Sequence, residues 1–175
     1  SGDVIVFRPT VPGNFSAGTF SVPLRDPGGT GKDVQGIALV ESTTSVGGST
    51  LNAGNLLLTF QGATHDTSLW RFVATGVGTG STAGTLTEFI RGSDININQT
   101  ISGVELVQST TTIGDVTLLP GQILLSIETN DSTVGDNSIA VEKRDVLPLN
   151  VTATGPGTTA ATATLFFQGN DVGIS

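Results

Sequence analysis

The sequence has no cysteine, methionine or tyrosine, and it has one histidine and one tryptophan. Without cysteine there are no disulfides, thiolate metal sites, iron–sulfur clusters or cysteine nucleophiles. The single histidine, His65, rules out a site built from several imidazoles, and no G-x-S-x-G motif accompanies it for serine hydrolysis. Because it lies next to Asp66 in a polar stretch, His65 is predicted to be a solvated loop residue. We therefore predict that the protein is not an enzyme.

Positive charge is also scarce. Seven Lys and Arg residues stand against fifteen Asp and Glu residues, which gives a formal net charge of −8 at pH 7. Binding to a nucleic-acid backbone or an anionic membrane requires clustered positive charge, so neither partner is predicted. Long hydrophobic runs are missing too: apolar runs such as residues 56–58 and 165–167 are far short of the roughly 20 residues that cross a bilayer. No membrane insertion is predicted.

What is abundant favours β-structure. Gly accounts for 24 of the 175 residues, and Thr, Ser, Val, Leu and Ile are frequent. No stretch of a dozen residues keeps apolar positions at helical spacing without an interruption by Gly, Thr or Pro. A chain of this length can bury a core without disulfides. We predict one all-β domain over residues 1–175.

The chain also repeats itself. Residues 36–61 align without gaps with residues 103–128, and twelve positions are identical. Upstream, residues 7–10 and 17–20 align with residues 72–75 and 83–86. A constant spacing near 66 residues indicates an internal duplication of one supersecondary unit.

The duplication predicts two full units, about 3–61 and 62–128, and a partial unit over 129–175. Each full unit contains four short strands, which in the second unit fall at residues 69–75, 84–90, 103–108 and 121–128. We predict a β-sandwich or flattened barrel built from about two and a half four-stranded repeats. The alternative is a set of propeller-blade-like units of a larger or multi-subunit assembly, since a propeller normally needs four or more blades.

The repeat carries recognisable motifs. They are F-R-P-T at residues 7–10, A-G-T-F at 17–20, F-Q-G-N-D-V at 167–172, and two G-x-x-L-V copies that begin at Gly36 and Gly103. This pattern resembles tandem β-rich repeats of large secreted or cell-surface prokaryotic proteins. The resemblance implies an extracellular or surface location and a role as an adhesin or stalk module.

One loop is a candidate cation site. Residues 128–137 are rich in oxygen donors, and Glu128, Asp131 and Asp136 are weak candidate ligands for calcium, which takes six to eight oxygens. The loop lacks the D-x-[DN]-x-[DN]-G spacing, so a plain hairpin loop is the other interpretation. No other cofactor is predicted.

Glycans could be attached or bound. Four N-x-[ST] sequons start at Asn14, Asn98, Asn130 and Asn150, and they are acceptors if the source glycosylates secreted proteins. Trp70 shares a predicted strand face with Phe72. It is either a core residue or a platform for a sugar or a subunit contact.

Together these features predict a non-enzymatic extracellular structural or adhesive module. An incomplete last unit would leave a strand edge that a neighbouring subunit could complete, which would produce a filament. The predicted partners are copies of the protein itself or neighbouring modules of a longer chain, and glycans. The alternative is a calcium-supported carbohydrate-binding module, resting on Trp70 and the loop at 128–137.

Overall fold

A computed structural model of the chain describes residues 2–27, 32–62, 66–78 and 82–174. Over these residues the regular structure consists of antiparallel strands and two short 3-10 helices, and there is no α-helix. The predicted all-β class is confirmed. None of the described segments forms a helix long and apolar enough to cross a membrane.

The first four-stranded sheet has the order β3-β6-β7-β8. Its strands are β3 (Asp33–Leu39), β6 (Leu56–Gln61), β7 (Leu69–Gly76) and β8 (Ala83–Ile90). A small hairpin of β4 (Thr44–Val46) and β5 (Ser49–Leu51) connects β3 to β6, and η1 (Gly92–Ile95) follows β8.

The second sheet has the order β9-β12-β15-β16, so its strands follow one another along the chain as those of the first sheet do. They are β9 (Ile101–Leu106), β12 (Ile123–Ile127), β15 (Leu147–Ala153) and β16 (Ala160–Ala163). The hairpin of β10 (Thr111–Ile113) and β11 (Val116–Leu118) lies between β9 and β12, and η2 (Gly169–Val172) ends the unit. The hairpin of β13 (Asp131–Val134) and β14 (Ile139–Val141) has no counterpart in the described part of the first sheet and its connections.

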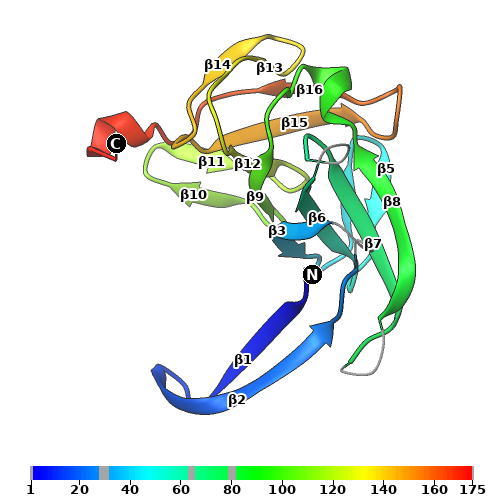
Figure 1. The fold of residues 1–175 in the computed structure, drawn as a ribbon. Helices are drawn as coiled ribbons and strands as arrows, with labels where there is room; N and C mark the ends of the chain where they lie inside the picture. The colour runs from blue at the N-terminus through cyan, green and yellow to red at the C-terminus, as the bar shows by residue number, and fades with distance from the viewer. Residues whose placement is uncertain (1, 28–31, 63–65, 79–81, 175) are drawn as a thin grey trace.

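The remaining strands, β1 (Val4–Val11) and β2 (Asn14–Leu24), form a separate hairpin. Figure 1 shows it projecting away from the two sheets. Its register matches that of the β7–β8 hairpin: Phe7 pairs with Phe20 as Phe72 pairs with Leu86. The pairing of Pro9 with Gly18 likewise matches that of Ala74 with Gly84.

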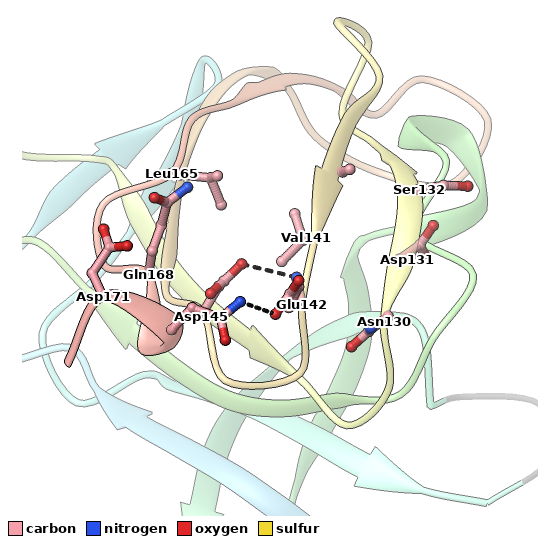
Figure 2. Close-up of a pocket in the computed structure, with 11 residues that line it drawn as sticks. Asn130, Asp131, Ser132, Val141, Glu142, Asp145, Leu165, Gln168 and Asp171 are labelled. Atoms are coloured by element: carbon pink, nitrogen blue, oxygen red, sulfur yellow. Dashed lines mark hydrogen bonds between the residues drawn. The ribbon is translucent and has the colours of Figure 1, made fainter. Parts of the chain in front are cut away.

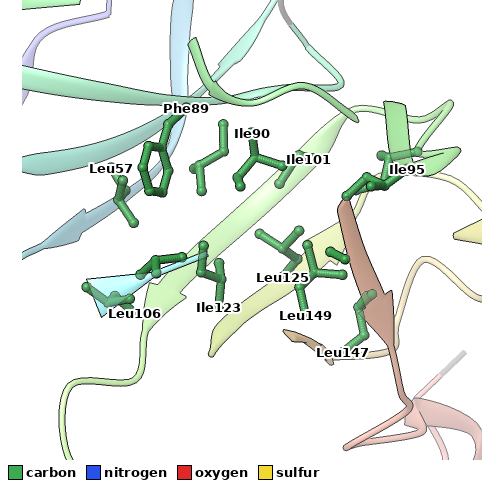
Figure 3. Close-up of a cluster of buried hydrophobic side chains, with 14 of the residues drawn as sticks. Leu57, Phe89, Ile90, Ile95, Ile101, Leu106, Ile123, Leu125, Leu147 and Leu149 are labelled. Atoms are coloured by element: carbon green, nitrogen blue, oxygen red, sulfur yellow. The ribbon is translucent and has the colours of Figure 1, made fainter. Parts of the chain in front are cut away.

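Two hydrophobic clusters hold these parts together. The larger one joins both sheets, and Figure 3 shows Leu57 and Ile90 of the first sheet close to Ile123, Leu125 and Leu149 of the second. The smaller one joins the first sheet to the base of the β1–β2 hairpin, where Val4 pairs with Leu24, and its buried members are Leu24, Leu58, Phe60 and Phe72.

The strand order decides between some of the predicted arrangements. In the described part of the chain each four-stranded sheet ends in two strands that pair on one side only, so neither sheet closes into a barrel. The flattened-barrel form is therefore not adopted. The predicted unit boundaries at 61/62 and 128/129 fall between β6 and β7 and between β12 and β15, inside the sheets.

Candidate functional site

The β1–β2 hairpin is hydrogen-bonded to the loop between β7 and β8. The backbone N–H of Gly78 donates to the carbonyl of Pro23, at 2.9 Å. The backbone N–H of Arg25, directly after β2, donates a hydrogen bond to the hydroxyl oxygen Oγ1 of Thr82.

The same two bonds recur one unit later. The backbone N–H of Gly155 donates to the carbonyl of Phe89 at 2.9 Å, and the N–H of Arg91 donates to Oγ1 of Thr159 at 3.0 Å. Thr159 is buried, with 6% of its surface exposed. The end of β2 is therefore bonded to the β7–β8 loop of the first sheet in the same way as the end of β8 is bonded to the β15–β16 loop of the second sheet.

A further contact between the sheets has no counterpart among the described residues at the far side of the second sheet. The β4–β5 hairpin packs on β15, where Ser49 Oγ lies 2.6 Å from Thr154 Oγ1 and Val46 is 1% exposed. In the matching β10–β11 hairpin, Ile113 is 51% exposed and Val116 is 43% exposed. The second hairpin presents apolar side chains to solvent where the first one is covered.

The side chain of Gln108, which follows β9, links the second sheet to the end of β3 in the first sheet by hydrogen bonds. Its side-chain oxygen accepts the backbone N–H groups of Glu41 and Ser42, at 2.6 and 2.9 Å. Its amide nitrogen donates to the carbonyl of Leu39 at 2.9 Å. One amide side chain therefore satisfies three backbone groups at the end of β3.

An apolar groove of about 520 Å³ lies between the β1–β2 hairpin and the first sheet. Leu39 and Ile37 of β3 line it and are 50% and 40% exposed. The matching leucine of the second sheet, Leu106, is 2% exposed. The other lining residues are Val4, Ile5, Val6, Pro23, Leu24, Gly54, Leu56, Ala74 and Val77.

The projecting hairpin also carries exposed aromatic rings. The ring centroids of Phe7 and Phe20 are 4.8 Å apart, and those of Phe7 and Phe15 are 6.5 Å apart. Phe15 and Phe20 are each 74% exposed. Contiguous exposed apolar side chains on a surface can mark an interaction site.

A polar pocket of about 490 Å³ opens between β13–β14 and η2 (Figure 2). Two of its carboxylates, those of Glu142 and Asp145, are hydrogen-bonded to nearby groups. Asp145 Oδ2 accepts the backbone N–H of Glu142 at 2.9 Å, and Glu142 Oε2 accepts the side-chain amide of Asn170 and the guanidinium of Arg144. These bonds hold the loops of the pocket in place.

Two of the three predicted calcium ligands, Asp131 and Asp136, accept hydrogen bonds from backbone amides of other segments. Asp131 is buried, and its Oδ2 accepts the N–H of Asn98 at 2.7 Å. Asp136 Oδ2 accepts the N–H of Ala161 at 2.9 Å, and Glu128 is exposed at the end of β12. No group of three or more His, Cys, Asp or Glu side chains in the described residues is arranged to hold a metal ion.

The four sequon asparagines are all exposed. Asn14 begins β2 and Asn150 lies within β15, where its side-chain oxygen accepts from Gln122. Asn98 and Asn130 lie in loops. Each of these side chains makes at least one hydrogen bond within the chain.

Trp70 packs partly buried against the smaller cluster, with the ammonium group of Lys32 5.4 Å from its ring centroid. The ring therefore lies beside the core with a cation–π contact, and its role as a platform for a sugar or a subunit contact stays a prediction. His65 lies outside the described residues, so its predicted loop position is not addressed.

One carboxylate on the second sheet has a shifted pKa. Loss of hydration against the sheet is the largest cause that raises the pKa of Glu105, and the nearby charge of Glu41 raises it further. A backbone hydrogen bond at Leu106 acts in the opposite direction.

Comparisons of the chain with protein-family models, with curated proteins and with solved structures give no match.

Proposed function

We propose that this chain is a non-enzymatic structural module, a β-sandwich-like stack of repeat units that belongs to an extracellular or cell-surface stalk or adhesin. The observation that carries the proposal is the recurrence of the hydrogen bonds at Pro23 and Arg25, which reappear at Phe89 and Arg91. Because equivalent backbone positions make the same hydrogen bonds at both contacts, the same rotation and translation relate each unit to the next.

An arrangement of this kind is open-ended. Each unit packs mainly on its neighbours, so stability and length are both built up unit by unit, as in other repeat proteins. Heterologous contacts that do not close into a ring produce linear assemblies. A linear stack of rigid β units suits a spacer or scaffold that holds surfaces apart.

In this proposal the repeat length is the one found in the sequence, near 66 residues, and the units begin at β3 and β9. The β1–β2 hairpin is then the second half of a further unit, because its register is that of β7–β8. The boundaries at 3–61, 62–128 and 129–175 describe the same period from a different starting point.

Assembly through strand edges is part of the proposal. Among the described strands, β1 pairs only with β2, whereas its counterpart β7 pairs with both β6 and β8. An open edge beside exposed apolar side chains is a template for a strand from a neighbouring module.

Immunogold electron microscopy of source cells, with an antibody raised against this chain, tests the location and role. We expect label on a surface layer or on fibres that extend from the cell. Label confined to the cytoplasm would overturn the proposal. Hydrolase screens on glycans and esters should be blank, and a purified chain that turns over any of these substrates would contradict the non-enzymatic role.

A further inference from the structure

We propose that the apolar groove and the outer edge of β1 together form an acceptor site for a polypeptide segment with the strand–hairpin–strand pattern of residues 33–61. The site would take the segment by pairing its second strand with β1 and by covering the groove with its apolar face. This inference rests on the proposed function, since it takes the units to stack in series.

The two hydrophobic clusters provide the first argument, because one is a partial copy of the other. Every buried member of the smaller cluster has a counterpart in the larger one at the matching position of the next unit. The counterparts of Leu24, Leu58, Phe60 and Phe72 are, in order, Ile90, Leu125, Ile127 and Leu149.

The larger cluster has additional members, and five of them come from one segment of the first unit. They are Ala38, Val40, Val46, Leu51 and Leu57, which lie on β3, β4, β5, β6 and directly after β3. No described residue takes their place in the smaller cluster. What the smaller cluster lacks is therefore the first half of a unit, from the β3 position to the β6 position.

Exposure of the neighbouring side chains gives the second argument. Leu106 and Leu39 occupy the same position in the two sheets, yet Leu106 is 2% exposed and Leu39 is 50% exposed. Residues of the first unit cover Leu106 in the larger cluster. The groove at Leu39 is the space that the corresponding half-unit would fill.

The free strand edge gives the third argument and sets the register. Leu56, Leu57 and Leu58 of β6 pair with Phe72, Arg71 and Trp70 of β7. The matching residues of β1 are Phe7, Val6 and Ile5. The second strand of the segment should therefore run antiparallel to β1, with its three central apolar residues opposite Phe7, Val6 and Ile5.

A second copy docked end to end would place the far face of its second sheet against the apolar groove. That face fits the groove poorly. Ala38, which is 2% exposed in the contact between the units, is matched there by the acidic residue Glu105. A carboxylate at that point would lose hydration against the apolar groove. The segment that fits has a small apolar residue at this position, as residues 33–61 do.

An extended chain tests the proposal. A copy of residues 33–68 is fused directly before Val4, because Val4 occupies the β1 position that Leu69 occupies in β7. Hydrogen exchange followed by mass spectrometry then compares the amides of Val4–Val11 in the extended and the original chain. We expect exchange in β1 to slow by at least about 100-fold and the binding of an apolar fluorescent dye to fall.

A matched extension serves as the control. It carries Ala38→Glu and Leu57→Asp in the added copy only, so that the length and the linker are unchanged and the face toward the groove is charged. We expect β1 to exchange as fast as in the original chain. The amides of β12 provide an internal reference, and unchanged exchange there shows that both extended chains remain folded.

Two results would overturn the inference. One is equal exchange of β1 in the extended, control and original chains. The other is a concentration-dependent protection of β1 in the original chain, seen with dimers in analytical ultracentrifugation, which would make a second copy the occupant. Neither result bears on surface labelling of cells, so failure of this inference is distinguishable from failure of the proposed function.

Discussion

At the scale of single residues, two glycines are required by the rings beside them. A Cβ atom at Gly84 would lie 2.5 Å from both the Phe72 ring and the Val73 carbonyl oxygen. A Cβ atom at Gly18 would lie 2.4 Å from both the Phe7 ring and the Arg8 carbonyl oxygen. In each hairpin a phenylalanine lies over a cross-strand glycine, so no larger residue fits without movement of the backbone.

Gly84→Ala should lower the free energy of unfolding by about 1 to 3 kcal/mol, because the added methyl group overpacks against the backbone as well as the ring. Gly76→Ala is the control in the same pair of strands, since its nearest neighbour would be Ala83 at 3.6 Å. Urea unfolding monitored by Trp70 fluorescence measures both. Equal stability of the two variants would show that the ring and the glycine are not tightly packed.

Glu105→Gln should stabilise the protein at neutral pH. The raised pKa means that ionisation of Glu105 costs free energy in the folded state, so its contribution to stability falls as the pH rises through the folded pKa. The gain should be below about 1 kcal/mol because solvent screens the charge, and it should vanish near pH 3, where the carboxyl is protonated in both states. Thermal melts from pH 3 to 8 measure it, with Glu128→Gln, a glutamate that directly follows β12, as the control.

At the scale of elements, the hairpins are fixed by side chains that cap backbone groups of other segments. Asp131 starts β13 and accepts from Asn98, while Asp136 in the following turn accepts from Ala161 on β16. No described hairpin of the first unit matches β13–β14, so these two carboxylates anchor a part of the chain that the described repeat does not include.

Asp131→Ala should destabilise the protein by about 1 to 3 kcal/mol, because the backbone N–H groups of Asn98 and Thr133 would lose the acceptor that the buried carboxylate provides. Glu128→Ala, at an exposed neighbouring position, should change stability by less than about 0.5 kcal/mol. Thermal unfolding of both variants compares them. A loss at Glu128 as large as that at Asp131 would indicate a shared role for the two carboxylates.

Calcium is expected to leave the melting temperature of the wild-type chain unchanged, since the carboxylate oxygens of Asp131 and Asp136 already accept backbone N–H groups. Melts in millimolar calcium and in a chelator measure this. A rise of more than about 2 °C with calcium that disappears in Asp131→Ala would instead support the predicted calcium loop.

At the scale of the whole molecule, the contact between units decides which side chains are core. The larger cluster includes residues of both sheets and of the hairpins between them, while the smaller cluster depends on the start of the projecting hairpin. Equivalent strand positions therefore bury more apolar side chains in the larger cluster than in the smaller one.

Leu106→Ala and Leu39→Ala make this difference measurable. Leu106 is fully packed, so its truncation should cost about 2 to 4 kcal/mol through lost burial and a cavity. Leu39 is half exposed in the groove, and its truncation should cost less than about 1 kcal/mol. Denaturant unfolding of both variants checks the expectation, and equal costs would mean that the groove is covered in solution.

Part of this structure was predictable from local pattern. The strand predicted at residues 69–75 corresponds to β7, because the segment is rich in apolar and aromatic residues and is bounded by Ser68 and Gly76. The hairpins β4–β5, β10–β11 and β13–β14 were not predicted as strands, since three or four residues are too few to show alternation. The carboxylates of the candidate calcium loop could not be assigned, because their backbone partners are distant in sequence.

The sequence by itself determined the all-β class and the spacing of the pattern, because strand propensity, glycine-rich turns and identical positions are local properties. Only the tertiary structure decided which copy of each position is buried. Leu39 and Leu106 are the same residue in the same local motif, yet one is exposed and the other is core. Burial depends on what packs against a residue, and that neighbour comes from another part of the stack.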